Sequence, residues 1–210
     1  MSKIEIIPVE YGKSVLPGDQ VFRGGDSNVS YDILFMIYLI KAGEKLILAD
    51  AGCETMPGFV MRDFVGPVKA LEKIGVTPKD ITDVIITHSH HDHIESVNYF
   101  KDSNIYIQKD EYNAGKGYIS DDLKVILFDD EAELCPGVKA VKIGGHSKGS
   151  CIVEIEKDEK IYVIAGDECY LRQCIEKQIP TGCSACPEKS EEFIKKYKDD
   201  KYVLLLCHDK

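Results

Sequence analysis

The chain has 210 residues, of which 44% are hydrophobic and 30% are charged, a composition that supplies a buried core and excludes a largely disordered protein. Its 36 acidic residues outnumber 26 Lys and Arg, giving a formal net charge of -10. Because such a surface repels phosphate backbones, we expect no nucleic-acid partner. No apolar run approaches the roughly 20 residues of a membrane helix, and the first residues do not resemble an export signal. We therefore predict a cytoplasmic protein without a membrane partner.

Hydrophobic segments recur along the chain without a linker or a change of composition, which predicts a single domain over residues 1–210. In the first half, strands are predicted at residues 4–9, 33–41 and 46–49, and the last two form an antiparallel hairpin. Residues 66–75 then have apolar side chains at helical spacing, with a proline near the start and a glycine at the end.

The rest of the chain continues this mixture of strands and helices. A late helix is predicted at residues 190–197, and further strands are predicted at residues 83–86, 105–108, 124–128, 138–143, 151–155, 161–164 and 202–206. The strands at 33–41 and 46–49 are apolar on both faces, which is typical of a sheet that is covered on both sides. The pattern predicts an α/β protein with two packed sheets flanked by helices, in four layers.

Four of the six histidines lie within residues 88–93, directly after a predicted strand. Imidazole and carboxylate groups are metal ligands, and residues two apart in an extended loop point the same way. His88 and His90 can therefore share one ion, while Asp92 and His93 face a second position. The hexapeptide thus predicts a metal site.

Three further residues follow other predicted strands, where functional sites are often assembled. His146 comes after residues 138–143, Asp167 after 161–164, and His208 after 202–206. A carboxylate can bridge two ions through its two oxygens. These residues are the additional candidate ligands.

Taken in order, these motifs resemble the metallo-β-lactamase superfamily of binuclear metal hydrolases over nearly the whole chain. The family's His-x-His-x-Asp-His signature stands at residues 88–93, its Gly-His-x-x-Gly-Ser segment at 145–150 and its Asp-x-Gly turn at 50–52. The resemblance implies an αββα sandwich of two mixed β-sheets. It also implies two divalent ions, with zinc the expected metal and iron or manganese as alternatives. One ion would be held by His88, His90 and His146 and the other by Asp92, His93 and His208, with Asp167 bridging them and Asp50 orienting ligands.

Within the family, residues 167–170 resemble the N-acyl homoserine lactonases, in which a tyrosine follows the bridging aspartate by three positions. Tyr170 is then expected to donate a hydrogen bond to the developing oxyanion or the leaving alkoxide, and Asp92 to relay a proton. The expected reaction is cleavage of a lactone or ester bond of a small molecule by a metal-bound hydroxide. A packing role for Tyr170 is the alternative, and a homodimer is left open.

Two other reactions remain as alternatives on the same scaffold. A thioester hydrolase of the glyoxalase II type shares the metal ligands, although such enzymes are usually longer, with a C-terminal substrate domain. A persulfide-type oxidoreductase, which would hold a single iron, is the second alternative. It stays open because ligand types alone do not identify the metal.

Three features lie outside these motifs. Lys148 stands where the family usually has proline, so it either attracts an anionic substrate group or is a solvated lysine. Cys183 and Cys186 form a Cys-x-x-Cys pair that either serves redox or metal chemistry or has no function. Met56, Phe59, Met61 and Phe64 lie in a segment that can overhang a site, and we expect at least two of them to pack in the core instead.

Overall fold

A computed structural model describes residues 4–210 of the chain. Within these residues the first sheet has six strands, which are β1 (Ile4–Pro17), β2 (Ser30–Ala42), β3 (Lys45–Ala49), β4 (Asp83–Ile86), β5 (Asn104–Gln108) and β6 (Lys124–Phe128). The second sheet has five, which are β7 (Glu131–Cys135), β8 (Val138–Lys142), β9 (Cys151–Lys157), β10 (Lys160–Ile164) and β11 (Tyr202–Leu205).

The strand order is β1-β2-β3-β4-β5-β6 in the first sheet and β11-β10-β9-β8-β7 in the second. In the first sheet β1, β2 and β3 pair in antiparallel fashion, whereas β3 to β6 are parallel. In the second, β10 and β11 are parallel and the other pairs antiparallel. Both sheets are therefore mixed, as predicted.

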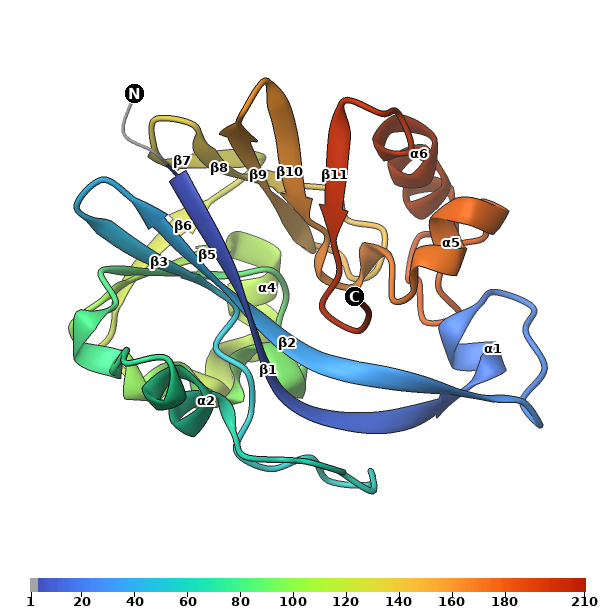
Figure 1. Cartoon of the computed structure of the whole chain (residues 1–210), viewed down its shortest axis with the longest axis horizontal. Helices are drawn as coiled ribbons and strands as arrows, with labels where there is room; N and C mark the ends of the chain where they lie inside the picture. The colour runs from blue at the N-terminus through green and yellow to red at the C-terminus, as the bar shows by residue number, and fades with distance from the viewer. Residues whose placement is uncertain (1–3) are drawn as a thin grey trace.

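Helices cover the outer faces of the two sheets (Figure 1). The α-helices are α1 (Gly18–Val21), α2 (Pro67–Lys73), α3 (His91–Ile94), α4 (Lys109–Gly115), α5 (Arg172–Lys177) and α6 (Pro187–Tyr197). Short 3-10 helices occupy Pro78–Asp80, Glu95–Tyr99, Lys116–Tyr118 and Gly166–Glu168. In Figure 1, α2 and α4 lie beside the first sheet, and α6 lies beside β11 of the second. The predicted four-layer α/β fold is confirmed.

Strand β2 shows why the chain forms four layers. Met36, Tyr38 and Ile40 point into a buried cluster between the two sheets, together with Val153 and Ile155 of β9. The alternate residues Ile37 and Leu39 of β2 belong to a second buried cluster, on the face that the helices cover. Because successive side chains of a strand point to opposite faces, a run that is apolar at every position is buried on both sides.

The sequence prediction missed several elements. Strand β1 continues beyond Val9 to Pro17, after a register shift between Glu10 and Gly12, where an irregular residue spacing hides the alternation of a strand. Strand β7 alternates charged and apolar residues on an exposed edge. Helices α1, α3, α4 and α5 have four to seven residues, too few for a clear helical period. None of the described helices is long and apolar enough to cross a membrane.

Candidate metal centre

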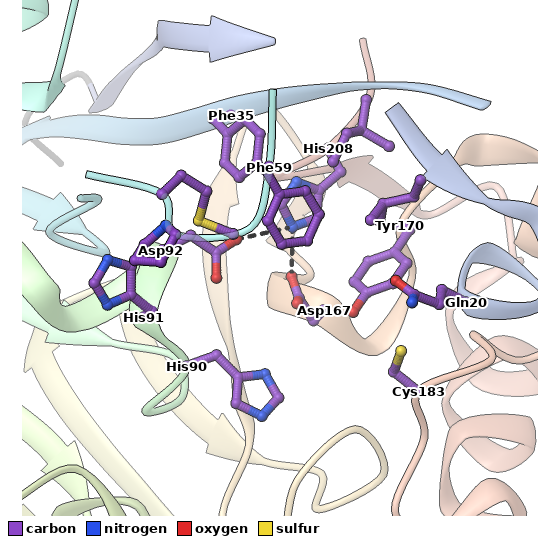
Figure 2. A pocket seen from close by; sticks show the side chains of 14 residues that line it. Gln20, Phe35, Phe59, His90, His91, Asp92, Asp167, Tyr170, Cys183 and His208 are labelled. Atoms are coloured by element: carbon purple, nitrogen blue, oxygen red, sulfur yellow. Dashed lines mark ion pairs between the residues drawn. The ribbon is translucent and has the colours of Figure 1, made fainter. Parts of the chain in front are cut away.

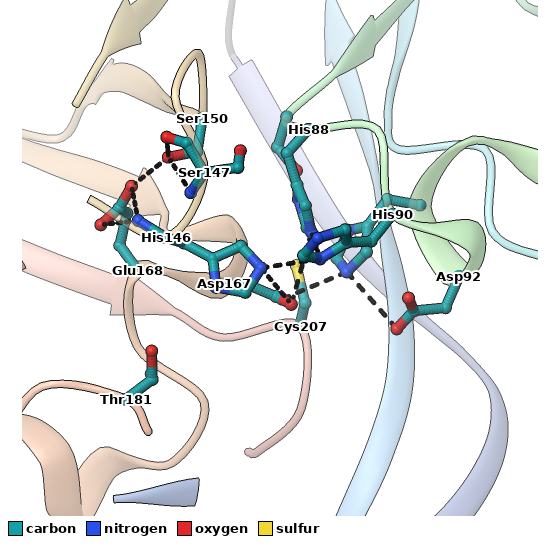
Figure 3. Close-up of polar contacts among 12 residues, drawn as sticks. His88, His90, Asp92, His146, Ser147, Ser150, Asp167, Glu168, Thr181 and Cys207 are labelled. Atoms are coloured by element: carbon teal, nitrogen blue, oxygen red, sulfur yellow. Dashed lines mark hydrogen bonds and ion pairs between the residues drawn. The ribbon is translucent and has the colours of Figure 1, made fainter. Parts of the chain in front are cut away.

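The predicted ligands come together where the ends of β4, β10 and β11 meet the loop after β8 (Figure 3). Their donor atoms form two groups in which all atoms lie within 4.8 Å of one another. The members of the first group are His88, His90, His146 and Asp167, and those of the second are Asp92, His93 and His208. The structure thus brings together the side chains of each predicted set, and it also places His93 within the same distance of Asp50 and Cys207.

The first group is a cluster of three imidazoles facing one carboxylate oxygen. His90 Nδ1 lies 3.0 Å from His88 Nε2 and 2.8 Å from His146 Nε2. Asp167 Oδ2 lies 3.4 Å from His88 Nε2 and also 3.4 Å from His146 Nε2. Three nitrogens and one oxygen therefore converge on one position.

The second group uses the other oxygen of the same carboxylate. Asp167 Oδ1 lies 3.1 Å from His93 Nε2 and 3.1 Å from His208 Nε2. The carboxylate of Asp92 approaches the same two nitrogens at 3.5 and 3.6 Å. Each oxygen of Asp167 thus faces a different set of nitrogens, a geometry that would let the carboxylate be shared between two cations.

A site that suits cations should contain buried polar atoms that lack hydrogen-bond partners within the protein. Among the described residues, three buried side-chain polar atoms have no partner, and all belong to candidate ligands: His93 Nε2, His146 Nδ1 and Asp167 Oδ1. A buried polar atom without a partner costs about 1–3 kcal/mol. Since His93 Nε2 and Asp167 Oδ1 face each other inside the second group, a divalent cation would satisfy both. Nitrogen and oxygen donors of this kind suit zinc, iron or manganese.

Burial and neighbouring charges shift the pKa values of the candidate histidines in different directions. Burial holds the pKa of His146 well below its usual value and also lowers the pKa of His90. Burial lowers the pKa of His93 as well, but the carboxylates of Asp167, Asp50 and Asp92 outweigh this and raise it. His90 and His146 are therefore neutral at pH 7, which is the form that binds metals.

Outer contacts orient the two histidines of the second group. His93 Nδ1 lies 2.8 Å from Asp50 Oδ2, and His208 Nδ1 lies 2.7 Å from the carbonyl oxygen of Leu34. Because a carbonyl only accepts, His208 Nδ1 carries a hydrogen and its Nε2 keeps a lone pair for the centre. Asp50 also accepts hydrogen bonds from the backbone and the hydroxyl of Thr87, so it joins the ends of β3 and β4.

Two buried glutamates that the sequence analysis did not select hold the metal loops, which we define as residues 88–93 and 145–150. Glu168 accepts hydrogen bonds from the backbone N–H groups of Gly145 and His146 and from the hydroxyls of Ser150 and Ser190. Burial raises its pKa in spite of these bonds. Because Glu168 directly follows Asp167, one short turn carries both the candidate ligand Asp167 and the carboxylate that holds the backbone of His146 in place.

Glu111 joins the two metal loops to each other. Its Oε2 accepts from the backbone N–H and the hydroxyl of Ser89, while its Oε1 accepts from Ser147 Oγ and from the N–H of Gly149. A Cβ added at Gly149 would lie 2.1 Å from Gln108 Oε1, and one added at Gly145 would lie 2.3 Å from Glu168 Oε2. The glycines of the Gly-His-x-x-Gly-Ser segment are therefore needed for these close approaches.

A cavity of about 470 Å³ opens onto the centre (Figure 2). Its lining from the candidate site comprises His90, Asp92, Asp167, Tyr170 and His208. Its apolar lining comprises Leu16, Ile33, Phe35, Met56, Pro57 and Phe59, and Gln20, His91 and Cys183 also border it. The site thus combines a polar floor with a largely apolar wall, as small-molecule sites do.

Tyr170 stands beside both ligand groups. Its ring centroid lies 5.1 Å from that of His208 and 5.9 Å from that of His146. Burial raises the pKa of its hydroxyl well above the usual value, and the charge of Asp167 adds to the effect. The hydroxyl is therefore protonated at neutral pH and can act as a donor.

The segment between β3 and α2 divides as expected. Met56 and Phe59 line the cavity, whereas Met61 and Phe64 pack against β1, where a Cβ added at Gly12 would lie 2.9 and 2.7 Å from their side chains. Two of the four residues thus face the cavity and two help to bury β1.

Lys148 does not border the cavity, which favours the alternative of a solvated lysine. Its side chain is 83% exposed, and its ammonium group lies 2.7 Å from Asp110 Oδ1. The geometry of the loop turns residue 148 outward, because the backbone of Gly149 and the hydroxyl of Ser147 face Glu111.

The Cys-x-x-Cys pair is divided in the structure. Cys183 borders the cavity, whereas Cys186 Sγ lies 3.6 Å from Glu188 Oε2. Both are free thiols, and neither belongs to a candidate metal group among the described residues. The structure offers no support for a second metal site at these cysteines.

Comparisons with known proteins agree with this geometry. The profile of the metallo-beta-lactamase superfamily matches residues 36–172. A probable metallo-hydrolase from Methanocaldococcus jannaschii is 30% identical over 142 residues, which is 68% of this chain and 64% of that protein. An N-acyl homoserine lactonase from Bacillus thuringiensis is 25% identical over 203 residues, covering 82% of this chain and 80% of the lactonase.

A solved structure shares the whole fold. A crystallised N-acyl homoserine lactone hydrolase with the product N-hexanoyl-L-homoserine at its catalytic metal centre superposes with a TM-score of 0.83 at 23% identity, covering 99% of this chain and 93% of that one. The prediction that this chain is a metal-dependent hydrolase is confirmed by these relatives, and the chain belongs to the metallo-beta-lactamase superfamily.

Proposed function

We propose that this protein is a binuclear metal-dependent hydrolase that cleaves the lactone or ester bond of a small molecule. The observation that carries the proposal is the Asp167 carboxylate, whose two oxygens face two separate sets of histidine nitrogens. The relative from Bacillus thuringiensis is named as a lactonase, and it covers most of this chain. The cavity beside the centre is of a size that small molecules occupy.

In this proposal His88, His90 and His146 would hold one zinc ion and Asp92, His93 and His208 a second, with Asp167 available to both. Two divalent ions at these positions would supply an activated water and a polarised substrate carbonyl. Glu168 and Glu111 keep the ligand loops at a fixed spacing through their hydrogen bonds. The ligands are thereby preorganised, so binding of the ions does not require the loops to rearrange.

Tyr170 and Asp92 are assigned the proton and hydrogen-bond roles. The Tyr170 hydroxyl, which is protonated at neutral pH, donates to the oxygen that gains negative charge. Asp92 borders the cavity, with its side chain 13% exposed, so it can accept a proton from the attacking water and pass it to the leaving oxygen. The oxygen of water joins the carbonyl carbon, the bond to the leaving oxygen breaks, and the proton ends on that oxygen.

The test combines metal analysis with substrate turnover. We expect about two divalent ions per chain and hydrolysis within a panel of lactones, esters and thioesters. Tyr170→Phe should keep the metal and lower kcat about 100-fold, the effect of losing one donor to an oxyanion. Tyr99→Phe is the matched control, because Tyr99 is 54% exposed and does not border the cavity.

Other outcomes would contradict the proposal. A single iron with no hydrolysis would favour the persulfide-type oxidoreductase, and turnover of thioesters alone would favour the glyoxalase II type. An unchanged kcat in Tyr170→Phe would return Tyr170 to a packing role.

A further inference from the structure

His91 is the histidine of residues 88–93 that belongs to neither ligand group among the described residues. Its ring nitrogens are both engaged elsewhere. Nε2 lies 2.8 Å from the carbonyl oxygen of Thr55, and Nδ1 lies 3.2 Å from the hydroxyl oxygen of Tyr118. Because the carbonyl only accepts, Nε2 carries the hydrogen, and Nδ1 accepts from Tyr118. Neither nitrogen has a lone pair left for a metal ion.

The carbonyl that His91 binds begins one wall of the cavity. We call residues 55–59 the cavity wall, since Met56, Pro57 and Phe59 line the cavity directly after Thr55. Within the wall, the N–H of Phe59 donates to the carbonyl of Met56 at 3.3 Å, so the segment forms a turn of its own. Figure 2 shows Phe59 in front of His208 and Asp167, with His91 on the far side of Asp92.

Few hydrogen bonds fix this wall to the rest of the described chain. Before it, the N–H of Glu54 donates to Glu95 Oε2 at 2.7 Å. After it, Ser14 Oγ donates to the carbonyl oxygen of Val60 at 3.0 Å. Between these two points, the bond from His91 to the Thr55 carbonyl is the shortest side-chain hydrogen bond to the wall among the described residues. Besides the packing of Met56 and Phe59 against the core, the position of the wall therefore depends on His91.

We propose that His91 is a positioning residue that holds the cavity wall against the metal centre and so determines which substrates bind. His91 lies between His90 and Asp92, so the wall is attached to the same short segment that supplies two candidate ligands. Met56 and Phe59 present apolar surface to the cavity, which suits an apolar part of the substrate remote from the reacting carbonyl. This proposal rests on the proposed function for its substrate, but the attachment of the wall can be measured without turnover.

The test compares His91→Ala with His91→Gln, whose amide can still donate to the Thr55 carbonyl. Tyr118→Phe is the matched control, because it removes the bond to Nδ1 and leaves the bond to Thr55. For a substrate with an apolar chain, we expect His91→Ala to raise KM about tenfold, the effect of one lost hydrogen bond, with a much smaller change in kcat and unchanged metal content. His91→Gln should restore most of the affinity, and Tyr118→Phe should stay near the parent protein.

Limited proteolysis measures how firmly the cavity wall is held, even if the parent protein hydrolyses no lactone or ester. Chymotrypsin should cleave after Phe59 faster in His91→Ala than in His91→Gln or the parent, with the site located by mass spectrometry. Equal cleavage in all variants, together with an unchanged KM, would overturn the proposal. Loss of metal in His91→Ala would also overturn it, because His91 would then serve the centre itself. Failure of the parent to hydrolyse the panel, with faster cleavage in His91→Ala, would refute the proposed function and leave the role of His91 intact.

Discussion

The metal loops and the cavity wall meet at the same cavity, but they are held very differently. Two buried carboxylates, Glu111 and Glu168, accept hydrogen bonds from backbone and side-chain groups of the metal loops. Among the described residues, the side-chain hydrogen bonds to the wall come from His91 alone, to the carbonyl and the hydroxyl of Thr55, and the bond of Ser14 lies just beyond its end. The part of the site to which we assign the chemistry is thus held by several buried hydrogen bonds, while the wall that lines the rest of the cavity is held by few. Such a division would let substrate preference change without disturbing the candidate ligands.

The largest expected effect comes from the carboxylate that the two ligand groups share. Asp167→Asn should lower activity by more than about 100-fold, since even residues one step removed from a metal change affinity or activity about 10–100-fold. Bound metal, measured by elemental analysis, should fall with it. Asp129→Asn is the control, because that carboxylate pairs with Lys109 at the surface. Full metal content and activity in Asp167→Asn would remove the basis for a shared carboxylate.

Removal of the Glu168 carboxylate, which holds the second metal loop, should affect stability as well as metal binding. Glu168→Ala leaves buried N–H and hydroxyl donors without a partner, and we expect the free energy of unfolding to fall by about 2–4 kcal/mol. Urea unfolding of the parent and the variant measures it. Glu168→Gln, which keeps one acceptor oxygen, should fall between them. If Glu168→Ala is as stable as the parent, the metal loops are no better braced than the wall.

The hydrogen bonds of the second buried glutamate, Glu111, predict that the stability of the fold depends on pH. Burial raises the pKa of Glu111, but hydrogen bonds from Ser147, Ser89 and Gly149 outweigh burial and leave the pKa below its usual value of 4.5. A carboxyl with a depressed pKa in the folded state stabilises the fold above its unfolded pKa, and this contribution is lost as the pH falls through the folded pKa.

The parent protein should therefore lose stability between about pH 5 and pH 3 more steeply than Glu111→Gln, which has no carboxyl to titrate there. Urea unfolding in the presence of a chelator measures this difference, so that metal release does not contribute. Parallel curves for the two proteins would show that Glu111 does not titrate with the fold.

The smallest expected effect concerns Lys148, which belongs to the second metal loop but has its side chain at the surface. Lys148→Ala should leave kcat and KM within about twofold of the parent, because the Lys148 ammonium pairs with Asp110 at the surface and an exposed pair contributes little. A marked rise in KM for an anionic substrate would show that charge reaches the cavity from a greater distance than the contacts suggest.

The same contrast between the two regions explains what could be predicted from the sequence. The ligands were selected because imidazoles and carboxylates followed predicted strands, and strands β4, β10 and β11 have nearly the predicted bounds. The two sheets followed from runs such as β2, which is apolar on both faces. In both cases the signal is local, because it lies within a few residues of the chain.

Long-range contacts left no such signal. Glu111 acts by accepting hydrogen bonds from residues more than 20 positions away, and no spacing in the sequence reveals a backbone donor. The sequence offered one hint, since residues 167–170 resemble the lactonases, but a resemblance does not state what Glu168 binds. The bond between His91 and Thr55 joins residues 36 positions apart and depends on the final path of the segment after β3.

The position of His208 has a consequence for how the protein acquires its metal during synthesis. The backbone carbonyls of His208 and Cys207 accept from the N–H groups of Leu34 and Met36, so the last candidate ligand is bound to a strand made near the beginning. Residues 88–93 leave the ribosome long before residue 208 is added. Until then the second ligand group lacks a nitrogen, whereas the first group needs no residue beyond Asp167. The two groups are therefore completed at different points of synthesis, the second only when residues 207 and 208 have paired with β2.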